Sequence, residues 1–249
     1  VLVKVSGNPQ ILSNNDIQSA LNQAPDYVRQ FSYLNNPDKD PKKPYLVQFS
    51  FDGVAIRKLL QAAGQPIWGS NRPLVVAWIE VNQGQSHELI GSDSSSPVTA
   101  DINGLSQYLG VPLVLPMLDL SDIQSVGTES PLSAQWPNIQ AASQRYLPDA
   151  ILIGDVDATD PKAVSARWQL NNGGDIAQWQ TQGSSVKDAV DQGITTLTQN
   201  LAKQYAVVEN MSQQQTVQIQ MVGIKTIAQF AKASRYLNSL VGVKHVDVG

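Results

Sequence analysis

The chain has 249 residues, a net charge of −4 and a pI of about 5.1, and only 15% of its residues are charged. That length suits one large domain or two smaller ones and allows a sizeable hydrophobic core. The acidic balance argues against binding to nucleic acid, which needs a basic surface to neutralise phosphates. The lack of cysteine excludes disulfides, thiol catalysis and Cys-ligated metal. No stretch reaches the roughly 20 apolar residues that cross a membrane, so no transmembrane segment is predicted.

Strand and helix patterns alternate through the first half of the chain. Residues 1–7 alternate and are rich in valine, which predicts a strand. The helix predicted over 52–64 begins at an aspartate N-cap and ends at Gly64, because glycine adopts the left-handed conformation most easily. The runs 74–81 and 111–118 are apolar on both parities, which is typical of strands covered on both faces. Further strands are predicted at 31–34 and 45–51, and further helices at 14–30 and 100–110.

The second half predicts a helix, three strands and a longer helix. Every second residue of the strand at 163–170 is apolar, as expected for a sheet with one wet face. An Asn-Asn-Gly-Gly turn follows, so 163–182 is predicted to be an antiparallel hairpin. The remaining elements are a helix at 130–146 broken by Pro137, strands at 149–156 and 176–183, a helix at 184–208 and a linker at 209–215.

The C-terminal residues predict a compact βαβ unit. A strand at 216–224 places Val217 and Ile219 on one face, a helix follows at 225–242, and a second strand closes the unit at 243–248. Two strands and one helix bury too little apolar surface to be stable alone. We therefore expect this unit to dock on another surface, or to bind a partner by strand addition near Val217 and Ile219.

Together these elements predict an α/β (α+β) fold. It has a mixed sheet with packed helices and an antiparallel hairpin, followed by a small C-terminal βαβ unit equivalent to half of a ferredoxin-like module. The strands at 74–81 and 111–118 are expected in the interior of the sheet. The predicted domains are 1–210, with candidate sub-modules at 1–122 and 123–210, and 211–249.

The stretch GQPIWGSNRP, which begins at Gly64, is the most distinctive in the chain. Gly64 and Gly69 have the spacing of a phosphate loop, but a serine occupies the lysine position, and helix and strand come in the reverse order. A structural corner accounts for most of this stretch. Arg72 either fixes a loop carboxylate or carbonyl, or presents its guanidinium to a ligand. A half-exposed Trp68 or Trp136 near Arg72 is a candidate platform for a sugar or peptide; the alternative is that both pack in the core.

Carboxylates offer two further candidate sites. Asp155, Asp157 and Asp160 lie close together in sequence, but a calcium loop also needs a glycine at its sixth position and a glutamate at its twelfth, which this stretch lacks. We interpret the three as a polar turn. Asp119 and Asp122 are a candidate pair for acid–base chemistry, although Asp122 also suits the capping of the following turn. A hydrolase that uses only carboxylates, such as a glycosidase, therefore stays open.

The two histidines, His87 and His245, are weak catalytic candidates. His87 has Ser86 and Glu88 beside it, but neighbouring side chains on a strand point to opposite faces, so adjacency does not make a triad. The chain contains no GxSxG motif. With no cysteine and no supported phosphate motif, the common hydrolase and transferase mechanisms lack parts. We therefore predict no catalytic residue, no metal and no cofactor.

Seven blocks of sequence carry a family resemblance: VLVKVSGN, YVRQFSY, LVQFSFDG, LLQAAGQPIWGSNRPLVVAWIEV, GVPLVLPMLDLSD, IQAASQRYLPDAILIGDV and RWQL. Their order and spacing, over residues 1–183, resemble the bacterial envelope family called domain of unknown function 2066. The resemblance implies a protein that is exported in Gram-negative bacteria and has no established activity. It also implies that residues 1–7 are the end of a helix capped by Gly7, not the strand that the local pattern predicts.

The alternation of DAILIGDV with RWQL and a Gly-rich hairpin is also similar to the α/β modules of periplasmic accessory proteins. These are the amino-terminal domain of TolB, the activators of peptidoglycan synthases, and flagellar or secretion ring proteins; the similarity concerns fold alone. The resemblances imply a non-enzymatic periplasmic module that binds envelope proteins, within a larger outer-membrane or secretion assembly. The alternatives are a glycan or small-ligand binder and, third, a carboxylate-dependent hydrolase.

Overall fold

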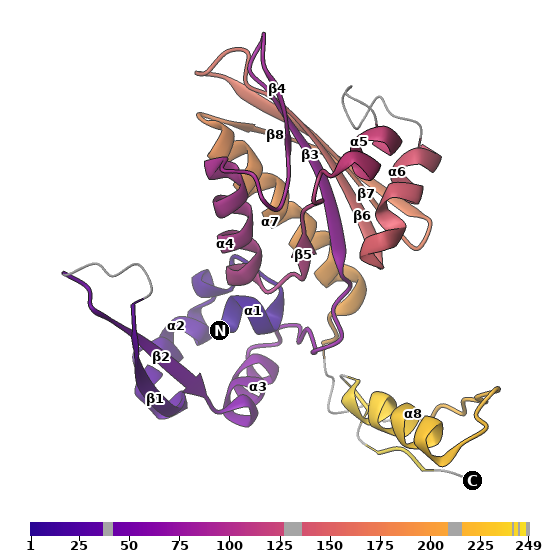
Figure 1. Ribbon diagram of the computed structural model, residues 1–249. Helices are drawn as coiled ribbons and strands as arrows, with labels where there is room; N and C mark the ends of the chain where they lie inside the picture. The colour runs from indigo at the N-terminus through magenta and orange to yellow at the C-terminus, as the bar shows by residue number, and fades with distance from the viewer. Residues whose placement is uncertain (37–41, 127–135, 209–215, 241, 244, 248–249) are drawn as a thin grey trace. The chain divides into compact units, whose positions relative to one another are not determined.

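The computed structural model describes residues 1–36, 42–126, 136–208, 216–240, 242–243 and 245–247 (Figure 1). The chain divides into two compact units, which we call the terminal unit (residues 1–70 and 206–249) and the sheet unit (residues 71–205). The domain boundary predicted after residue 210 lies outside the described residues and stays a prediction. The sub-module boundary predicted after residue 122 falls within the sheet unit.

Short helices and a two-stranded sheet make up most of the terminal unit. Its elements are α1 (Leu2–Ser6), η1 (Ile11–Ser13), α2 (Asn15–Leu21), η2 (Ala24–Tyr27), β1 (Val28–Asn35), β2 (Tyr45–Phe51), α3 (Gly53–Ala62) and α8 (Ile227–Ser239). α1 ends at Gly7, whose φ of 65° is left-handed. The strand predicted over residues 1–7 is therefore wrong and the glycine-capped helix is correct. Over only seven residues, the alternating apolar pattern fits a short buried helix as well as it fits a strand.

Two polar side chains cap helices of this unit. Asn14 Oδ1 accepts hydrogen bonds from two main-chain N–H groups in the first turn of α2, and Asp52 does the same for α3. The helix predicted over 14–30 ends at Leu21, before Pro25, whose ring nitrogen cannot donate the hydrogen bond that a helix interior needs. The buried apolar side chains of this unit are Leu2, Val3, Ile11, Ile17, Ile56, Leu60, Ile67 and Trp68.

A six-stranded mixed sheet organises the sheet unit and confirms the predicted fold class. Its strands are β3 (Val75–Asn82), β4 (His87–Ile90), β5 (Leu113–Val114), β6 (Ala150–Asp157), β7 (Val164–Asn172) and β8 (Asp175–Gly183). The order is β4-β3-β6-β7-β8, with β5 also paired to β3. β3 runs parallel to β5 and β6, and the other pairs are antiparallel. β7 and β8 form the predicted hairpin.

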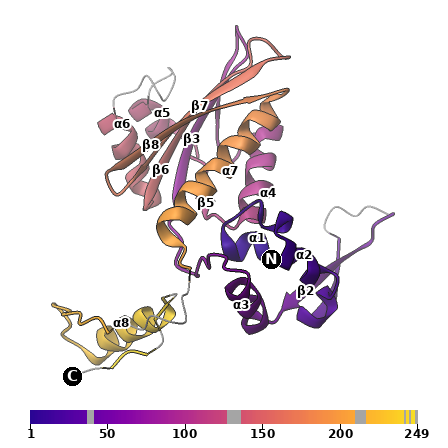
Figure 2. The ribbon, with the colours of Figure 1, turned by 180° about the vertical axis from the view of Figure 1, so that it is seen from behind.

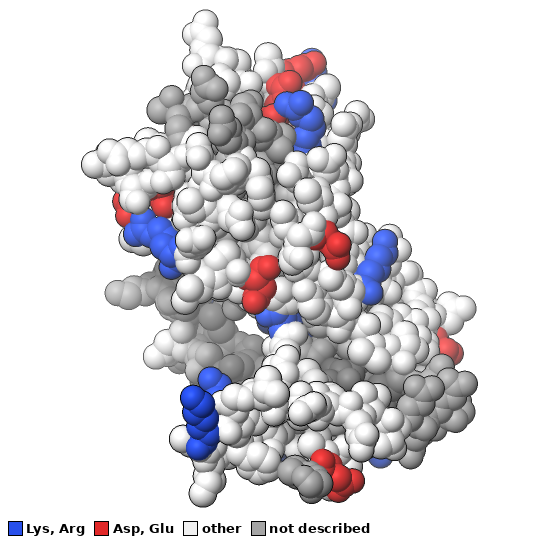
Figure 3. Space-filling view, turned by 90° about the vertical axis from the view of Figure 1, so that its right-hand side faces the viewer, with Lys and Arg blue, Asp and Glu red and all other residues white. Residues whose placement is uncertain are grey.

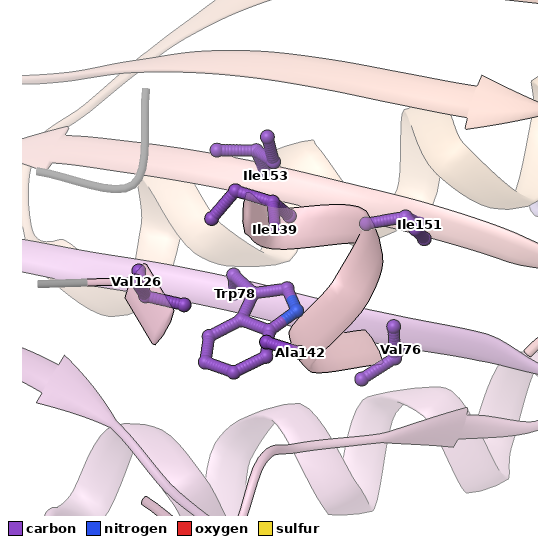
Figure 4. Packing of buried hydrophobic residues seen from close by; sticks show 7 residues of the cluster. All are labelled: Val76, Trp78, Val126, Ile139, Ala142, Ile151 and Ile153. Carbon is purple, nitrogen blue, oxygen red and sulfur yellow. The ribbon is translucent and has the colours of Figure 1, made fainter. Parts of the chain in front are cut away.

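Helices cover both faces of this sheet (Figures 1 and 2). α4 (Pro97–Leu109) and α7 (Val186–Tyr205) lie on one face, and α5 (Leu120–Val126) and α6 (Trp136–Ser143) lie on the other. On the second face, Trp78 donates a 2.9 Å hydrogen bond from Nε1 to Ser143 Oγ. It packs in the cluster drawn in Figure 4, which consists of Val76, Trp78, Val126, Ile139, Ala142, Ile151 and Ile153. In the part of the chain that is described, none of the helices has both the length and the apolar character needed to cross a membrane.

Of the two strands expected in the sheet interior, only one is a full strand. β3 is buried along almost its whole length, as the run at 74–81 predicts. The run at 111–118 pairs with β3 over two residues only, as β5. Pro112 and Pro116 flank this short strand, and because proline has no main-chain N–H, neither can donate a further hydrogen bond to the ladder.

The C-terminal segment contains the predicted helix, α8, which begins with a reciprocal capping box. The two strands predicted beside it are absent from the described residues of 216–226 and 242–247. Val217 and Ile219 are 73% and 63% exposed there. The βαβ expectation is therefore wrong for this segment: two strands and a helix gain too little from each other to form a stable sheet.

Candidate partner-binding surface

β1 and β2 form a two-stranded antiparallel sheet of their own. The register places Phe31 opposite Phe49 and Tyr33 opposite Val47. Because successive side chains on a strand point to opposite faces, these four side chains share one face. We call it the aromatic face, and it comprises Phe31, Tyr33, Tyr45, Val47, Phe49 and Phe51.

The opposite face of this sheet is mostly polar. It carries Gln30, Ser32, Gln48 and Ser50, with one apolar pair, Leu34 and Leu46. A sheet with this pattern normally turns its apolar side toward a core. Here Phe31, Tyr33 and Phe49 remain 57%, 67% and 52% exposed. Contiguous exposed apolar side chains of this kind mark interaction sites in folded proteins.

The rings of the aromatic face contact one another. The centroids of Phe31 and Tyr33 lie 6.0 Å apart with the rings nearly perpendicular, at 87°. The Phe31–Phe49 and Phe49–Phe51 centroids lie 6.3 Å and 6.4 Å apart. These separations fall in the range where aromatic pairs attract. The rings therefore form a continuous apolar strip along the sheet.

Charged residues of both signs flank the strands of the aromatic face: Asp26 precedes β1, and the sequence between the strands contains Asp38 and Asp40 as well as lysines. Arg29 is the only charged residue in β1 and β2, and the exposed Lys42 and Lys43 come just before β2. The nearest acid along the chain, Asp52, is engaged as the cap of α3. Its pKa is lowered, chiefly by the hydrogen bond from the main-chain N–H of Ala55.

Two of the residues singled out from the sequence, Trp68 and Arg72, have structural contacts. Trp68 is only 2% exposed, so its ring is not available as a ligand platform. Arg72 is half-buried and donates from Nη1 to the carbonyl of Gly110, at 2.6 Å, and burial lowers the pKa of its guanidinium. It therefore fixes a loop carbonyl, which is the first of the two roles considered for it.

The other three candidates lie elsewhere. Trp136 is half-buried and packs against the cluster of Figure 4, so its ring contributes to the core. Val217 and Ile219 are exposed, but no strand edge is formed by the described residues around them. Partner binding through these two side chains stays a prediction.

Asp119 and Asp122 lie together, as a carboxylate pair would, but both carboxylates already accept hydrogen bonds from other groups of the protein. Arg145 Nη1 lies 2.8 Å from Asp119 and 3.4 Å from Asp122. Tyr146 Oη donates to Asp122 at 2.6 Å, and the N–H of Leu118 donates to it at 3.0 Å. The hydrogen bond from Arg145 lowers the pKa of Asp119, and burial raises that of Tyr146. The main-chain N–H of Asp122 donates to Asp119, so Asp119 caps this turn instead of Asp122.

Asp155, Asp157 and Asp160 form a polar turn. Asp155 pairs with Arg167 on the neighbouring strand. Asp157 and Asp160 each accept a hydrogen bond from the main-chain N–H two residues further on, at 3.0 Å and 2.9 Å. The hydrogen bond from the main-chain N–H of Thr159 is the main reason why the pKa of Asp157 is lowered. Within the described residues, no group of three or more acidic or histidine side chains is arranged to hold a metal ion.

Neither histidine pairs with the residues beside it in the sequence. His87 Nδ1 lies 3.0 Å from Oε1 of the buried Glu80, on the neighbouring strand. His245 pairs with Asp247, and both side chains are largely exposed.

A shallow hollow lies over the β7–β8 hairpin, lined by Arg167, Trp168, Gln169, Gln178, Trp179 and Gln180.

Sequence reasoning missed the aromatic face. It identified strands over 31–34 and 45–51 but did not pair them. The available signal was the alternation of large apolar and small polar residues in both strands, joined by a loop rich in proline and asparagine. That signal predicts a hairpin with one apolar face, although it does not say whether a core covers that face.

Comparison with known proteins places a match on this part of the chain. A family described as a domain of unknown function (DUF8605) matches residues 1–69, which include β1 and β2. The resemblance to domain of unknown function 2066 is therefore wrong, since the matching family is a different one. The similarity was inferred from the order of short blocks over 1–183, whereas the match is confined to the N-terminal segment.

The other comparisons add little. No curated protein matches the chain. A solved structure described as "Crystal structure of uncharacterized protein" shares 16% identity over 53% of this chain and 83% of its own. Its TM-score of 0.18 is too low to support any statement about fold or function.

Proposed function

We propose that the chain is a non-enzymatic protein-interaction module, and that the aromatic face of β1 and β2 is its partner-binding surface. The observation that carries this proposal is the exposure of more than half of Phe31, Tyr33 and Phe49 on one face of an amphipathic sheet. Burying the exposed part of one such side chain against a partner stabilises a complex by roughly 1–1.5 kcal/mol. Aromatic side chains that become buried at an interface often dominate its affinity.

The low charge of the surface supports the same proposal. On the side of the molecule seen in Figure 3, acidic and basic side chains are few and form small scattered groups on a largely uncharged surface. Charged residues are depleted at the centres of protein interfaces, so β1 and β2, with a single charge between them, have a suitable composition.

The periplasmic location rested on the family resemblance that was wrong, so it remains an expectation without support from this structure.

The glycan-binding alternative relied on an exposed tryptophan near Arg72. Trp68 is buried, which removes the nearest tryptophan in sequence from that role. The hydrolase alternative relied on Asp119 and Asp122, whose carboxylates are engaged by Arg145 and neighbouring donors. Protein binding therefore has the most support.

A matched pair of variants tests the proposal. Phe31→Ser with Phe49→Ser removes one cross-strand pair from the aromatic face, and Ser32→Ala with Gln48→Ala changes the adjacent pair on the polar face. Proteins captured from the native host by the full chain are identified and quantified by mass spectrometry. The aromatic-face variant should lose a specific partner by roughly tenfold or more, and the polar-face variant should retain it. Equal recovery with both variants would contradict the proposal.

A further inference from the structure

The outer edge of β8 is an unusual strand edge. β8 is the last strand in the sheet order, and it pairs with β7 in unbroken register over nine residues. Proteins usually protect such an edge with lysine, proline or a β-bulge. β8 has none of these, and its only charged residue is Asp175 at its first position. The edge is therefore suited to receive another strand.

Main-chain groups alternate between the two sides of β8. The tight turn closes on the pair Asn172 and Asp175, and in such a hairpin hydrogen-bonded pairs then recur at every second residue. Gln192 Nε2 donates to the carbonyl of Gln182 at 2.8 Å, which confirms that this carbonyl points away from β7. The residues whose N–H and C=O point outward are therefore Ile176, Gln178, Gln180 and Gln182.

The sequence of β8 is nearly the same in both directions. Around Trp179 it reads Ala177-Gln178-Trp179-Gln180-Thr181. A two-fold axis at Trp179 would place Gln178 opposite Gln180 of a second copy, and both residues have outward-pointing main-chain groups. Symmetric dimers require a self-complementary surface of this kind. We propose that two copies of the chain pair through their β8 edges, antiparallel, about a two-fold axis at Trp179.

The side chains at the centre fit this pairing. Trp179 stacks on Trp168 with centroids 6.4 Å apart and the rings 13° from parallel. Its Nε1 is buried and has no hydrogen-bond partner within the described chain. Across the axis it meets Trp179 of the second copy in a non-hydrogen-bonded pair, where side chains approach most closely. On the other face, the amides of Gln178 and Gln180 meet their symmetry mates.

Charge favours a second copy at this edge. The sheet unit carries six lysines and arginines against fourteen acids, a net charge of −8. Two such units repel each other wherever their acidic side chains face one another. Residues 176–183 are uncharged, so two copies can meet there without like charges facing each other.

Charge variants of the full chain test both the dimer and its register. Sedimentation equilibrium should show a wild-type dimer that dissociates on dilution. Gln178→Lys with Gln180→Lys places like charges at both facing positions and should weaken dimerisation about tenfold or more. Gln178→Glu with Gln180→Lys places opposite charges there and should restore the dimer. An axis at residue 178 or 180 would make like charges face each other in that second variant, so its failure to dimerise would overturn the register.

A control variant with the same change in net charge distinguishes an effect at the strand edge from an effect of added charge elsewhere on the same face of the sheet. Ser165→Lys with Gln169→Lys adds two charges to the same face of β7, one strand inward, and should keep the dimer. If the edge variant does not fold, amide hydrogen exchange of the wild type tests the proposal instead. Protection of the main-chain N–H groups of Gln178 and Gln180 should rise with protein concentration. A monomeric wild type, an edge variant that dimerises like the wild type, or protection independent of concentration would overturn the proposal.

Discussion

Gly193 of α7 lies directly against the indole of Trp168 on β7. A Cβ atom at position 193 would lie 2.2 Å from both Cε2 and Cζ2 of that ring. A Cβ at Gly154 on β6 would lie 2.5 Å from another ring carbon, Cζ3. The ring is 2% exposed, and its Nε1 donates to Thr181 at 3.0 Å. Missing side chains on both a helix and a strand therefore make room for this tryptophan.

Gly193→Ala should destabilise the protein by about 1–3 kcal/mol, because the added methyl group overpacks a closed core. Gly104→Ala on α4 is the matched control, since no atom lies within 4 Å of the Cβ it would add. There the better helix propensity of alanine should leave stability unchanged or raise it by up to about 1 kcal/mol. Urea unfolding followed by tryptophan fluorescence measures both. Equal stability of the two variants would show that α7 does not press on Trp168 as described.

Asp122→Ala should destabilise the sheet unit by about 1–3 kcal/mol, because it leaves the partly buried donors of Tyr146 and Leu118 without their acceptor. The side chain of Asp122 is 1% exposed, whereas that of Asp119 is 41% exposed. Asp119→Ala should therefore cost less. Thermal unfolding of both variants gives the comparison, and a larger loss for Asp119→Ala would contradict the assigned network.

The pKa of Asp119 should respond to Arg145. The hydrogen bond from Arg145 holds this pKa below its ordinary value of 3.8, so Arg145→Gln should raise it toward 3.8. A depressed folded pKa means that the interaction stabilises the protein above 3.8 and that this contribution is lost as the pH falls through the folded pKa. A carbon-detected NMR titration of the Asp119 carboxylate measures the shift. An unchanged pKa in the variant would show that Arg145 is not its main partner.

The exposed rings of the aromatic face should contribute little to folding. Phe31→Ser with Phe49→Ser should change the free energy of unfolding far less than the roughly 3–5 kcal/mol typical of truncating a core phenylalanine. The two side chains are 57% and 52% exposed, so most of their apolar surface is already in contact with water. Chemical denaturation measures the effect. A loss of the core magnitude would mean that these rings serve folding instead of binding.

The elements predicted well from the sequence are those whose pattern is long and local. β7 and β8 are joined by an Asn-Asn-Gly-Gly turn, and α7 has twenty residues of helical pattern. The failures have local causes too. Pro112 and Pro116 interrupt a run that is apolar enough for a strand, and the alternation in residues 1–7 is too short to separate a strand from a helix ended by Gly7.

The candidate surface could be predicted only in part. The alternation that puts Phe31 and Phe49 on apolar positions is visible in the sequence, but their exposure depends on whether other parts of the chain cover the sheet. Burial of Trp68 likewise depends on neighbours distant in sequence, such as Val5, whose carbonyl accepts its main-chain N–H at 2.7 Å. Composition and local pattern contain neither piece of information.

Photo-crosslinking in the native host tests the central claim most directly. A photoreactive phenylalanine analogue placed at Phe49 would lie on the aromatic face, and the same analogue at Gln48 would lie on the polar face of the same strand. The account predicts a protein adduct from position 49 that is absent or much weaker from position 48. Equal adducts from both positions, or an adduct from position 48 alone, would contradict the assignment of the aromatic face as the partner-binding surface.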